Sequence, residues 1–224
     1  MHFEVIMKSI KCLSLVFVLT STFVLALSGT ALGDDSPPSW MRQAASGSLP
    51  GYDNDVEAVV LHNEQNVSLG NDGVQVTTEN YAVKVLTREG RRNAVASARY
   101  LVTSGKVRAI EAWLIRPNGT TKNYDKKVVL DLIMDPDDIY NEYRMKVIRG
   151  IEDAEVGSVF GYTVVSEDRP IYFQERWLSQ YNLPTIFSRY TLALPSGWKA
   201  AGVTYNHPQI TPQVNGSTYT WELR

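Results

Sequence analysis

The feature that most restricts the fold of this 224-residue chain is an alternation of polar and apolar residues with a period of two. In the segment STYTWELR, which ends at Arg224, threonine or glutamate alternates with tyrosine, tryptophan or leucine. This alternation is typical of a β-strand with one buried face. Further strand-like runs occur at residues 56–61, 94–102, 107–115, 158–165, 188–194 and 198–205. Most of the chain is therefore predicted to be strand and turn.

Turn-forming residues separate these runs. Asn71-Asp72-Gly73 predicts a β-hairpin, because an Asp-Gly pair accepts the positive φ angles of a tight hairpin turn. Other glycine- or proline-containing turns are expected at residues 88–90, 104–105, 117–119, 155–157 and 195–197. Short strands joined by such turns are typical of antiparallel sheets. We predict an all-β fold, an antiparallel β-sandwich with short helical turns.

The strand after the first hairpin changes phase. Val74 and Val76 share one face of this strand, whereas Tyr81 and Val83 lie on the other face. A period-two strand cannot shift its apolar face by one residue without an irregularity. We therefore expect a β-bulge or a bend near Glu79-Asn80.

Three other segments complete the predicted domain organisation. Residues 107–115 are apolar on both faces apart from two charged side chains, which predicts a central strand. Short helices of one or two turns are expected at residues 39–45 and 137–144. We expect a leader with a short helix over residues 34–54 and a β-sandwich domain over residues 55–224.

The first 33 residues resemble an export signal. Lys8 and Lys11 precede an apolar run at residues 13–27, and the small-residue sequence Ala31-Leu32-Gly33 follows. This order predicts a signal peptide cleaved after Gly33 and an exported product, periplasmic or extracellular, without membrane attachment after cleavage. Serine and threonine interrupt the run, which is short for a membrane span; a retained anchor is the alternative. The only cysteine, Cys12, lies in this segment, so apolar burial must stabilise the exported domain.

The charge balance restricts the partners of the chain. It carries 22 lysine and arginine residues against 24 aspartate and glutamate residues, a net charge of −2. Domains that bind nucleic acid usually carry a basic patch. We therefore predict no nucleic-acid partner.

Few residues outside the signal segment could support catalysis. No cysteine remains, and the histidines are His62 and His207. The Gly-x-Ser-x-Gly motif of serine hydrolases is absent, and a zinc site normally takes three or four ligands. We predict no catalytic, cofactor-binding or metal-binding residue and no cofactor. A hydrolase that uses either histidine with an acid such as Asp135 is an alternative.

The acidic run DLIMDPDDIYNE, residues 131–142, is the best candidate for a metal site. Asp135, Asp137 and Asp138 could supply oxygen ligands to Ca²⁺. Their spacing is not that of an EF-hand loop, and Pro136 restricts the backbone. We favour a solvated loop in which Asp137 caps a short helix.

Aromatic residues could form a carbohydrate-binding platform. The candidates are Trp113, Trp177, Trp198, Trp221, Tyr162, Tyr172 and Tyr190. Each lies in a strand-like run, where a large aromatic side chain normally packs in the core or against a neighbouring strand. We favour core packing and keep sugar stacking as the alternative.

Several segments resemble one family of exported bacterial proteins, in a consistent order. They are DVEAVVLHNEQNVSLGNDG (55–73), YAVKVLTREGRRNA (81–94), EAWLIRPNGTTKNY (111–124), YNEYRMKVIRGIEDAEVGSVFGYTV (140–164) and LSQYNLPTIFSRYTLALPSGW (178–198). Through these segments the chain resembles, from Trp40 onward, the family called domain of unknown function 3857. Arg149 departs from the family pattern, in which a proline is expected before Gly150.

This resemblance implies a function. Domains of the family typically precede a transglutaminase-like domain with a papain-like Cys-His-Asp triad. No residue of this chain matches the triad, so the resemblance implies no catalytic residue here and a chain that ends near or inside the β-domain. The expected function is a non-catalytic module that packs on the downstream domain or presents protein or cell-wall peptides to it. The alternative is a free-standing envelope module that binds glycan or peptide, with Trp177 as the first residue to test.

Overall fold

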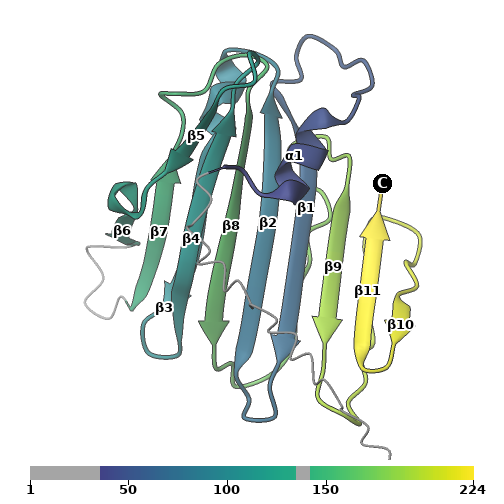
Figure 1. The fold of residues 1–224 in the computed structure, drawn as a ribbon. Coiled ribbons are helices and arrows are strands. Elements are labelled where there is room, and N and C mark those ends of the chain that lie inside the picture. The colour runs from purple at the N-terminus through teal and green to yellow at the C-terminus, as the bar shows by residue number, and fades with distance from the viewer. Residues whose placement is uncertain (1–35, 135–141) are drawn as a thin grey trace, which may run out of the picture. The chain divides into compact units, whose positions relative to one another are not determined.

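The computed structural model describes residues 36–134 and 142–224, which are mainly β-strands. Within these residues, an eight-stranded sheet and a three-stranded sheet are accompanied by one α-helix and two short 3-10 helices (Figure 1). The all-β prediction is confirmed. The predicted signal peptide, residues 1–33, lies outside the described residues.

The larger sheet has the strand order β10-β11-β9-β1-β2-β8-β4-β5. Its strands are β1 (Ala58–Leu69), β2 (Gln75–Val85), β4 (Gly105–Ile115), β5 (Thr121–Tyr124), β8 (Val159–Asp168), β9 (Ser188–Ala193), β10 (Gln213–Asn215) and β11 (Thr218–Leu223). Neighbouring strands are antiparallel, except that β1 and β9 run parallel. Because β8 and β9 also point the same way, the β8–β9 loop, residues 169–187, has to return along the sheet before β9 begins.

The three-stranded sheet packs on one face of the larger sheet, which we call the inner face. Its strands, in spatial order, are β3 (Val95–Leu101), β7 (Tyr143–Arg149) and β6 (Leu130–Ile133). Ala96 and Ile148 from this sheet are completely buried in one apolar cluster with Leu114 and Phe160 of the larger sheet. Removal of this apolar surface from water stabilises the two layers against each other.

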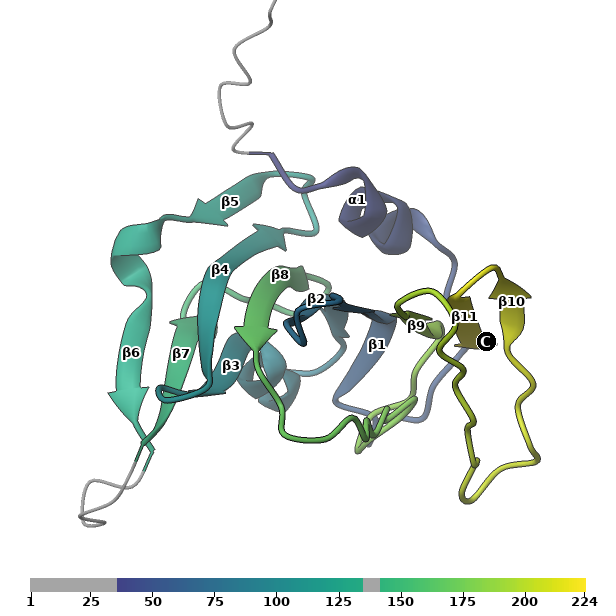
Figure 2. The same cartoon turned by 90° about the horizontal axis from the view of Figure 1, so that it is seen from below.

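The opposite, outer face is covered at one end by α1 (Ser39–Ser46), as Figure 2 shows. Met41 of this helix is completely buried in a cluster that includes Trp113. Gly161 of β8 permits the close approach, since a Cβ atom there would lie 2.8 Å from the Met41 sulfur. The helix predicted at residues 39–45 is confirmed.

The strand and turn predictions hold over much of the chain. Asn71-Asp72-Gly73 joins β1 to β2 as a hairpin turn, with Gly73 at a φ of 76°. The Val74 N–H donates to the Asp72 carboxylate at 3.1 Å. The predicted strands at residues 94–102, 107–115, 158–165 and 188–194 correspond to β3, β4, β8 and β9.

The irregularity predicted near Glu79-Asn80 is not present. β2 pairs without a break with β1 and β8 through these residues, and the register shift lies in β1 between Val60 and His62. Because alternate residues of a strand share a face, Glu79 lies on the same inner face as Tyr81 and Val83. The inner face of β2 therefore changes from polar to apolar along the strand, and the sequence pattern reflects that change.

Three further predictions are corrected. Residues 107–115 form β4, but β4 lies second from one edge of the sheet, and both its faces are apolar because each contributes to a buried cluster. Residues 198–205 form a loop, because β10 rather than this segment pairs with β11. Of the helix predicted at residues 137–144, residues 137–141 lie outside the described residues, and Tyr143 and Arg144 begin β7.

Candidate functional site

The inner face of the larger sheet carries an apolar cluster at each end. One is the cluster beneath the three-stranded sheet. The other contains Val67, Tyr190 and Trp221, and Trp177 of the β8–β9 loop packs against it. The β8–β9 loop and the β9–β10 loop, residues 194–212, lie on this side of the sheet (Figure 2) and are called the covering loops below.

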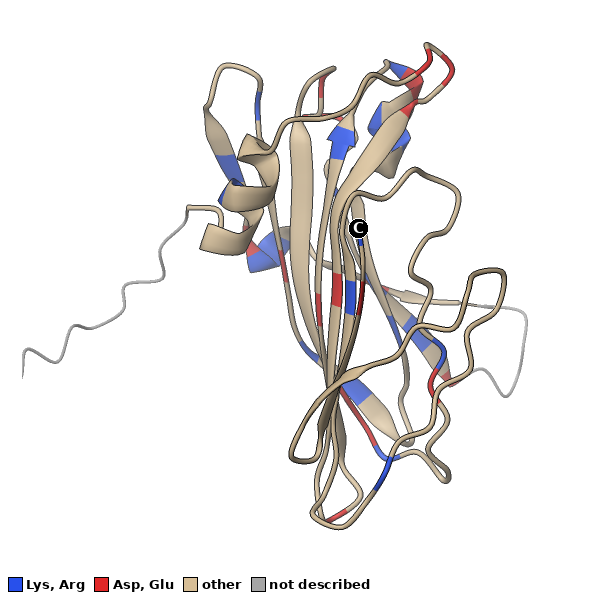
Figure 3. Ribbon diagram, turned by 90° about the vertical axis from the view of Figure 1, so that its right-hand side faces the viewer, with Lys and Arg blue, Asp and Glu red and all other residues tan. Residues whose placement is uncertain are grey.

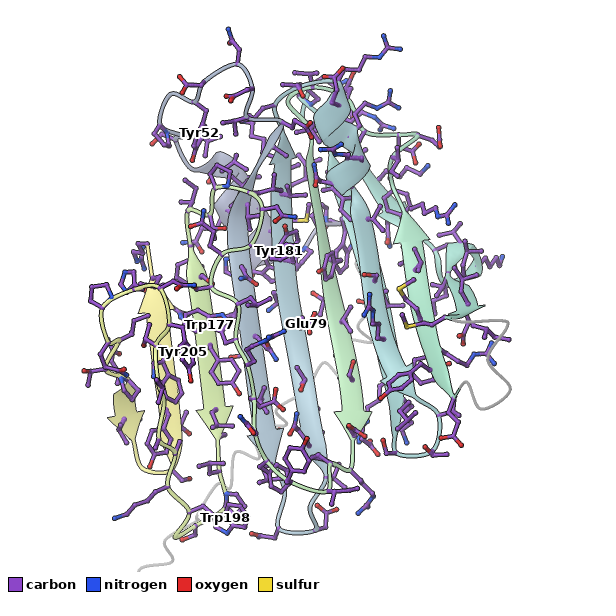
Figure 4. All side chains as sticks on the ribbon, turned by 180° about the vertical axis from the view of Figure 1, so that it is seen from behind. Tyr52, Glu79, Trp177, Tyr181, Trp198 and Tyr205 are labelled. Carbon is purple, nitrogen blue, oxygen red and sulfur yellow. The ribbon has the colours of Figure 1, made fainter. Side chains whose placement is uncertain are left out.

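A pocket with a volume of about 200 Å³ lies between the two clusters, and we call it the central pocket. Residues of β1, β2 and β8 form its floor, and residues 176–178 of a covering loop form its wall. The lining residues are Asn63, Glu64, Gln65, Glu79, Asn80, Tyr81, Tyr162, Arg176, Trp177 and Leu178. Figure 4 shows Glu79 and Trp177 beside each other on this side of the sheet.

The strand register places the floor residues. Gln65 of β1 lies opposite Glu79 of β2 and Tyr190 of β9. Two residues along, Tyr81 lies opposite Asn63 and Tyr162. Directly paired residues share a face, so a carboxylate, two amides and three tyrosines form adjacent rows on the inner face.

Glu79 is the most unusual residue of the central pocket. Burial raises the pKa of its carboxyl group above the ordinary value of 4.5. Among the described residues, no side chain forms a hydrogen bond or an ion pair with it. Glu79 is partly buried, and a partly dehydrated carboxylate without a counter-charge is unfavourable, so its presence calls for a reason other than stability.

Glu64, on the neighbouring strand, has the opposite environment. The His62 imidazole lies 3.5 Å from its carboxylate, Asn80 donates a hydrogen bond at 3.1 Å, and Arg189 lies 3.4 Å away. These partners lower the pKa of Glu64 from 4.5 to about 2, with the His62 contact the largest cause. Glu64 and Glu79 are therefore two glutamates on adjacent strands, one compensated and one uncompensated.

Three aromatic side chains, Tyr81, Tyr162 and Trp177, line the central pocket together with Glu79. Tyr81 and Tyr162 stack with their ring centroids 5.3 Å apart, and Trp177 stacks on Tyr190 at 6.1 Å. Burial raises the pKa of Tyr81 to about 12 and raises that of Tyr162 further, where the charge of Glu79 adds to the effect. The Trp177 indole N–H and the Tyr190 hydroxyl are buried and have no hydrogen-bond partner in the described part of the chain.

Hydrogen bonds attach the β8–β9 loop to the sheet beside the pocket. The Gln75 side-chain amide donates to the Glu175 carboxylate at 2.7 Å. The Asn63 amide donates to the Leu178 carbonyl and to the Ser188 hydroxyl, each at 3.0 Å. Two polar side chains of the inner face thus fix the loop that contributes Trp177.

Charges of both signs are interspersed over the described residues (Figure 3). The cation of the central pocket is Arg176, whose side chain is exposed and makes no ion pair within the described residues. The pocket lining thus carries one exposed positive group, Arg176, and two carboxylates, of which Glu64 is paired with His62 and Arg189 and Glu79 is not.

A second pocket, of about 450 Å³, lies between the segment before β1, the 3-10 helix Glu89–Asn93 and the β8–β9 loop. Its one cation, Arg92, is already paired with Glu57 at 2.6 Å, and the pocket contains no aromatic side chain. This pocket is therefore the weaker candidate.

The aromatic residues considered from the sequence occupy different environments. Trp113, Tyr190 and Trp221 are buried, as core packing predicts. Trp177, Tyr172 and Trp198 lie in loops rather than strands, so the strand prediction is wrong for them. Of the candidates, the structure brings Tyr162 and Trp177 into the central pocket. Glu79 was missed, although the phase change at this position was its signal.

The remaining candidates do not assemble into a site. His62 packs between the rings of Trp40 and Phe187 on the outer face, and His207 lies in an exposed loop against the Pro208 carbonyl. Asp135, Asp137 and Asp138 lie outside the described residues. In residues 36–134 and 142–224, no group of three histidine, cysteine or acidic side chains is placed to hold a metal ion.

Comparison with known proteins identifies the family. The sequence profile of the family described as "Domain of Unknown Function with solved-structure structure (DUF3857)" matches residues 71–224. The chain belongs to this family. A search of curated proteins finds no match to the DUF3857 chain.

A solved structure shares the fold. It is a crystal structure from Parabacteroides distasonis ATCC 8503 described as a "putative protease", with a TM-score of 0.63 and 17% sequence identity. The match covers 75% of the DUF3857 chain and 35% of the other chain, so this chain spans about a third of that protein's length. At this identity the likeness concerns the fold. Among the described residues, no helix is long and apolar enough to cross a membrane.

Proposed function

We propose that this β-domain is a non-catalytic module of an exported protein and packs against a transglutaminase-like domain of the same polypeptide. In this proposal the module positions that domain and presents protein or cell-wall peptides to it. The proposal rests on the motif resemblance and on the apolar residues that the covering loops expose.

The covering loops carry much apolar surface. Their exposed apolar residues include Ile171, Tyr172, Tyr181, Trp198, Val203 and Tyr205. Tyr181 and Tyr205 are 78% and 81% exposed, and Figure 4 shows both in the view of the inner face. Surfaces of this kind commonly contact another domain or protein. We assign the contact to a domain of the same polypeptide, because the similar crystal structure contains a much longer chain.

Catalysis would then belong to the second domain. Thiol acyl transfer and thiol-dependent peptide hydrolysis both require an activated thiolate. The only cysteine of this chain, Cys12, lies in the predicted signal peptide. The β-domain would contribute binding and orientation.

The first test is to read the gene beyond the Arg224 codon. A reading frame that continues into a globular segment with a cysteine, a histidine and an aspartate supports the proposal. A stop codon at that point removes the partner domain and contradicts it.

A second test measures hydrogen exchange in this chain and in the longer gene product. We expect slower amide exchange of residues 169–187 in the longer product, because docking would shield the loop. The turn at residues 155–157 lies outside the covering loops and serves as the control. Equal exchange of residues 169–187 in both proteins would contradict docking.

The second candidate function is a free-standing module that binds glycan or peptide. The supporting observation is Trp177, which lines the central pocket and has a buried indole N–H without a partner in the described chain. Trp177→Ala should abolish ligand binding. Unchanged ligand binding together with lost stability would assign Trp177 to the core and remove this candidate.

A further inference from the structure

We propose that the central pocket binds a single organic ammonium group, such as a lysine side chain or the amino terminus of a peptide. This inference goes beyond docking to a second domain, because it depends on residues of this chain alone. It also gives the binding-module candidate a ligand class.

The uncompensated carboxylate of Glu79 is the first argument. It lines the pocket, and within the described residues no side chain donates a hydrogen bond to it or pairs with its charge. Glu79 is partly buried, and a carboxylate that has lost part of its hydration is stabilised by a cation in direct contact. An ammonium group in the pocket would supply that cation, whereas a neutral sugar would leave the charge uncompensated.

The aromatic walls are the second argument. Tyr81 and Tyr162 form a stacked pair on the pocket floor, and Trp177 lines the pocket from the loop. The face of an aromatic ring attracts a cation within about 6 Å of its centroid, most strongly for tryptophan. Aromatic faces around a carboxylate therefore favour an organic cation and disfavour an anion.

The size of the pocket limits the ligand. Its volume of about 200 Å³ is below the roughly 300–1,000 Å³ that is usual for sites of drug-sized molecules. The end of one side chain or one chain terminus fits such a volume. The rest of a peptide would lie outside, near the exposed residues of the covering loops.

Removal of the Arg176 charge should change the ligand affinity in a direction that depends on the charge of the ligand. The Arg176 guanidinium group at the pocket mouth repels a cationic ligand and attracts an anionic one. Arg176→Ala should therefore strengthen ammonium binding, by about two- to fivefold for a solvent-exposed charge. If the pocket instead binds a carboxylate through Arg176, the same variant weakens binding and the proposal is wrong.

The test is a titration of the chain followed through the ¹³C carboxyl signals of its labelled glutamates and by calorimetry. One probe, Nα-acetyl-lysine amide, carries a side-chain ammonium, and the other, alanine amide, carries an α-ammonium. The neutral control probe is Nα,Nε-diacetyl-lysine amide. We expect one or both ammonium probes to bind, and the better probe identifies the source of the group. Failure of both ammonium probes, or equal binding of the neutral probe, overturns the proposal.

The matched variants are Glu79→Gln and Glu111→Gln. Glu79→Gln should weaken ammonium binding at least tenfold without loss of stability, because it removes an uncompensated buried charge. Glu111→Gln removes the same charge from an exposed position on the outer face of β4 and should leave binding unchanged. Equal affinity of the Glu79→Gln variant and the unmodified chain refutes the assignment. If a longer peptide binds through Trp177 while both ammonium probes fail, the ammonium assignment falls and the binding-module candidate remains.

Discussion

Replacing Glu79 with glutamine should stabilise the β-domain at neutral pH. The substitution keeps the shape of the side chain and removes a carboxylate that is partly buried without a counter-charge. A buried polar group without a partner costs about 1–3 kcal/mol. The central pocket is open to solvent, so we expect the free energy of unfolding to rise by about 1 kcal/mol, the lower end of that range. For a domain of this size, the melting temperature would rise by about 2–4 °C.

This gain should depend on pH with a definite sign. Burial raises the pKa of Glu79 in the folded state above its ordinary value of 4.5, so folding disfavours the ionised form. The penalty in the unmodified protein is complete above the folded-state pKa and disappears as the pH falls below 4.5. Glu79→Gln should therefore exceed the unmodified protein in stability at about pH 7 and match it at about pH 4.

Glu64→Gln is the matched control, for which we expect the free energy of unfolding to change in the opposite direction. The pKa of Glu64 is lowered to about 2, chiefly by His62, so its ionised form stabilises the fold above pH 4.5, and this contribution is lost as the pH falls toward 2. We expect Glu64→Gln to lose about 1–2 kcal/mol at neutral pH, after allowance for solvent screening. Urea unfolding at several pH values measures both variants. The reasoning is refuted if Glu79→Gln is destabilised at pH 7, or if its gain is independent of pH.

Three other substitutions test the packing of the domain. Gly161→Ala should reduce the free energy of unfolding by about 1–2 kcal/mol through contact with the Met41 sulfur; in a double-mutant cycle, Met41→Ala should relieve much of that loss, and additivity would disprove the contact. Phe160→Ala should lose about 3–5 kcal/mol by urea unfolding, because its side chain is completely buried in the larger cluster; a loss below about 1 kcal/mol would contradict that role. Asn63→Ala should speed hydrogen exchange in residues 169–187 by removing the hydrogen bond to the Leu178 carbonyl of that loop and the one to the Ser188 hydroxyl directly after it; unchanged exchange would show that these bonds do not hold the loop.

The sequence could predict where the strands of this fold lie better than it could predict which strands pair with each other. The hairpin at Asn71-Asp72-Gly73 was predictable because its turn chemistry is local. The parallel pairing of β1 with β9 was not, because it joins segments far apart in the chain and leaves no local signal. Residues 198–205 have strand-forming side chains, but strand formation also requires a partner strand, and β10 takes that position.

The candidate site was predictable in part. The chemistry of Trp177 marks it as a candidate from the sequence, but no local signal places it in a loop over the sheet. In the sequence, Glu79 indicates a bulge, because a period-two pattern records which residues share a face and not what covers that face. The covering element comes from a segment about a hundred residues further along, as the Gln75–Glu175 hydrogen bond illustrates.

The parallel pairing of β1 with β9 also has a consequence for the order of folding. Asn63 and Ser188, which face each other across this pair, are 125 residues apart in the chain. Closing so large a loop has a high entropic cost, so such contacts tend to form after local hairpins such as β1–β2. The half of the sheet that contains β9, together with the loop over the central pocket, would then form last and open first. A ligand bound in that pocket would slow this opening, because it binds the closed form alone.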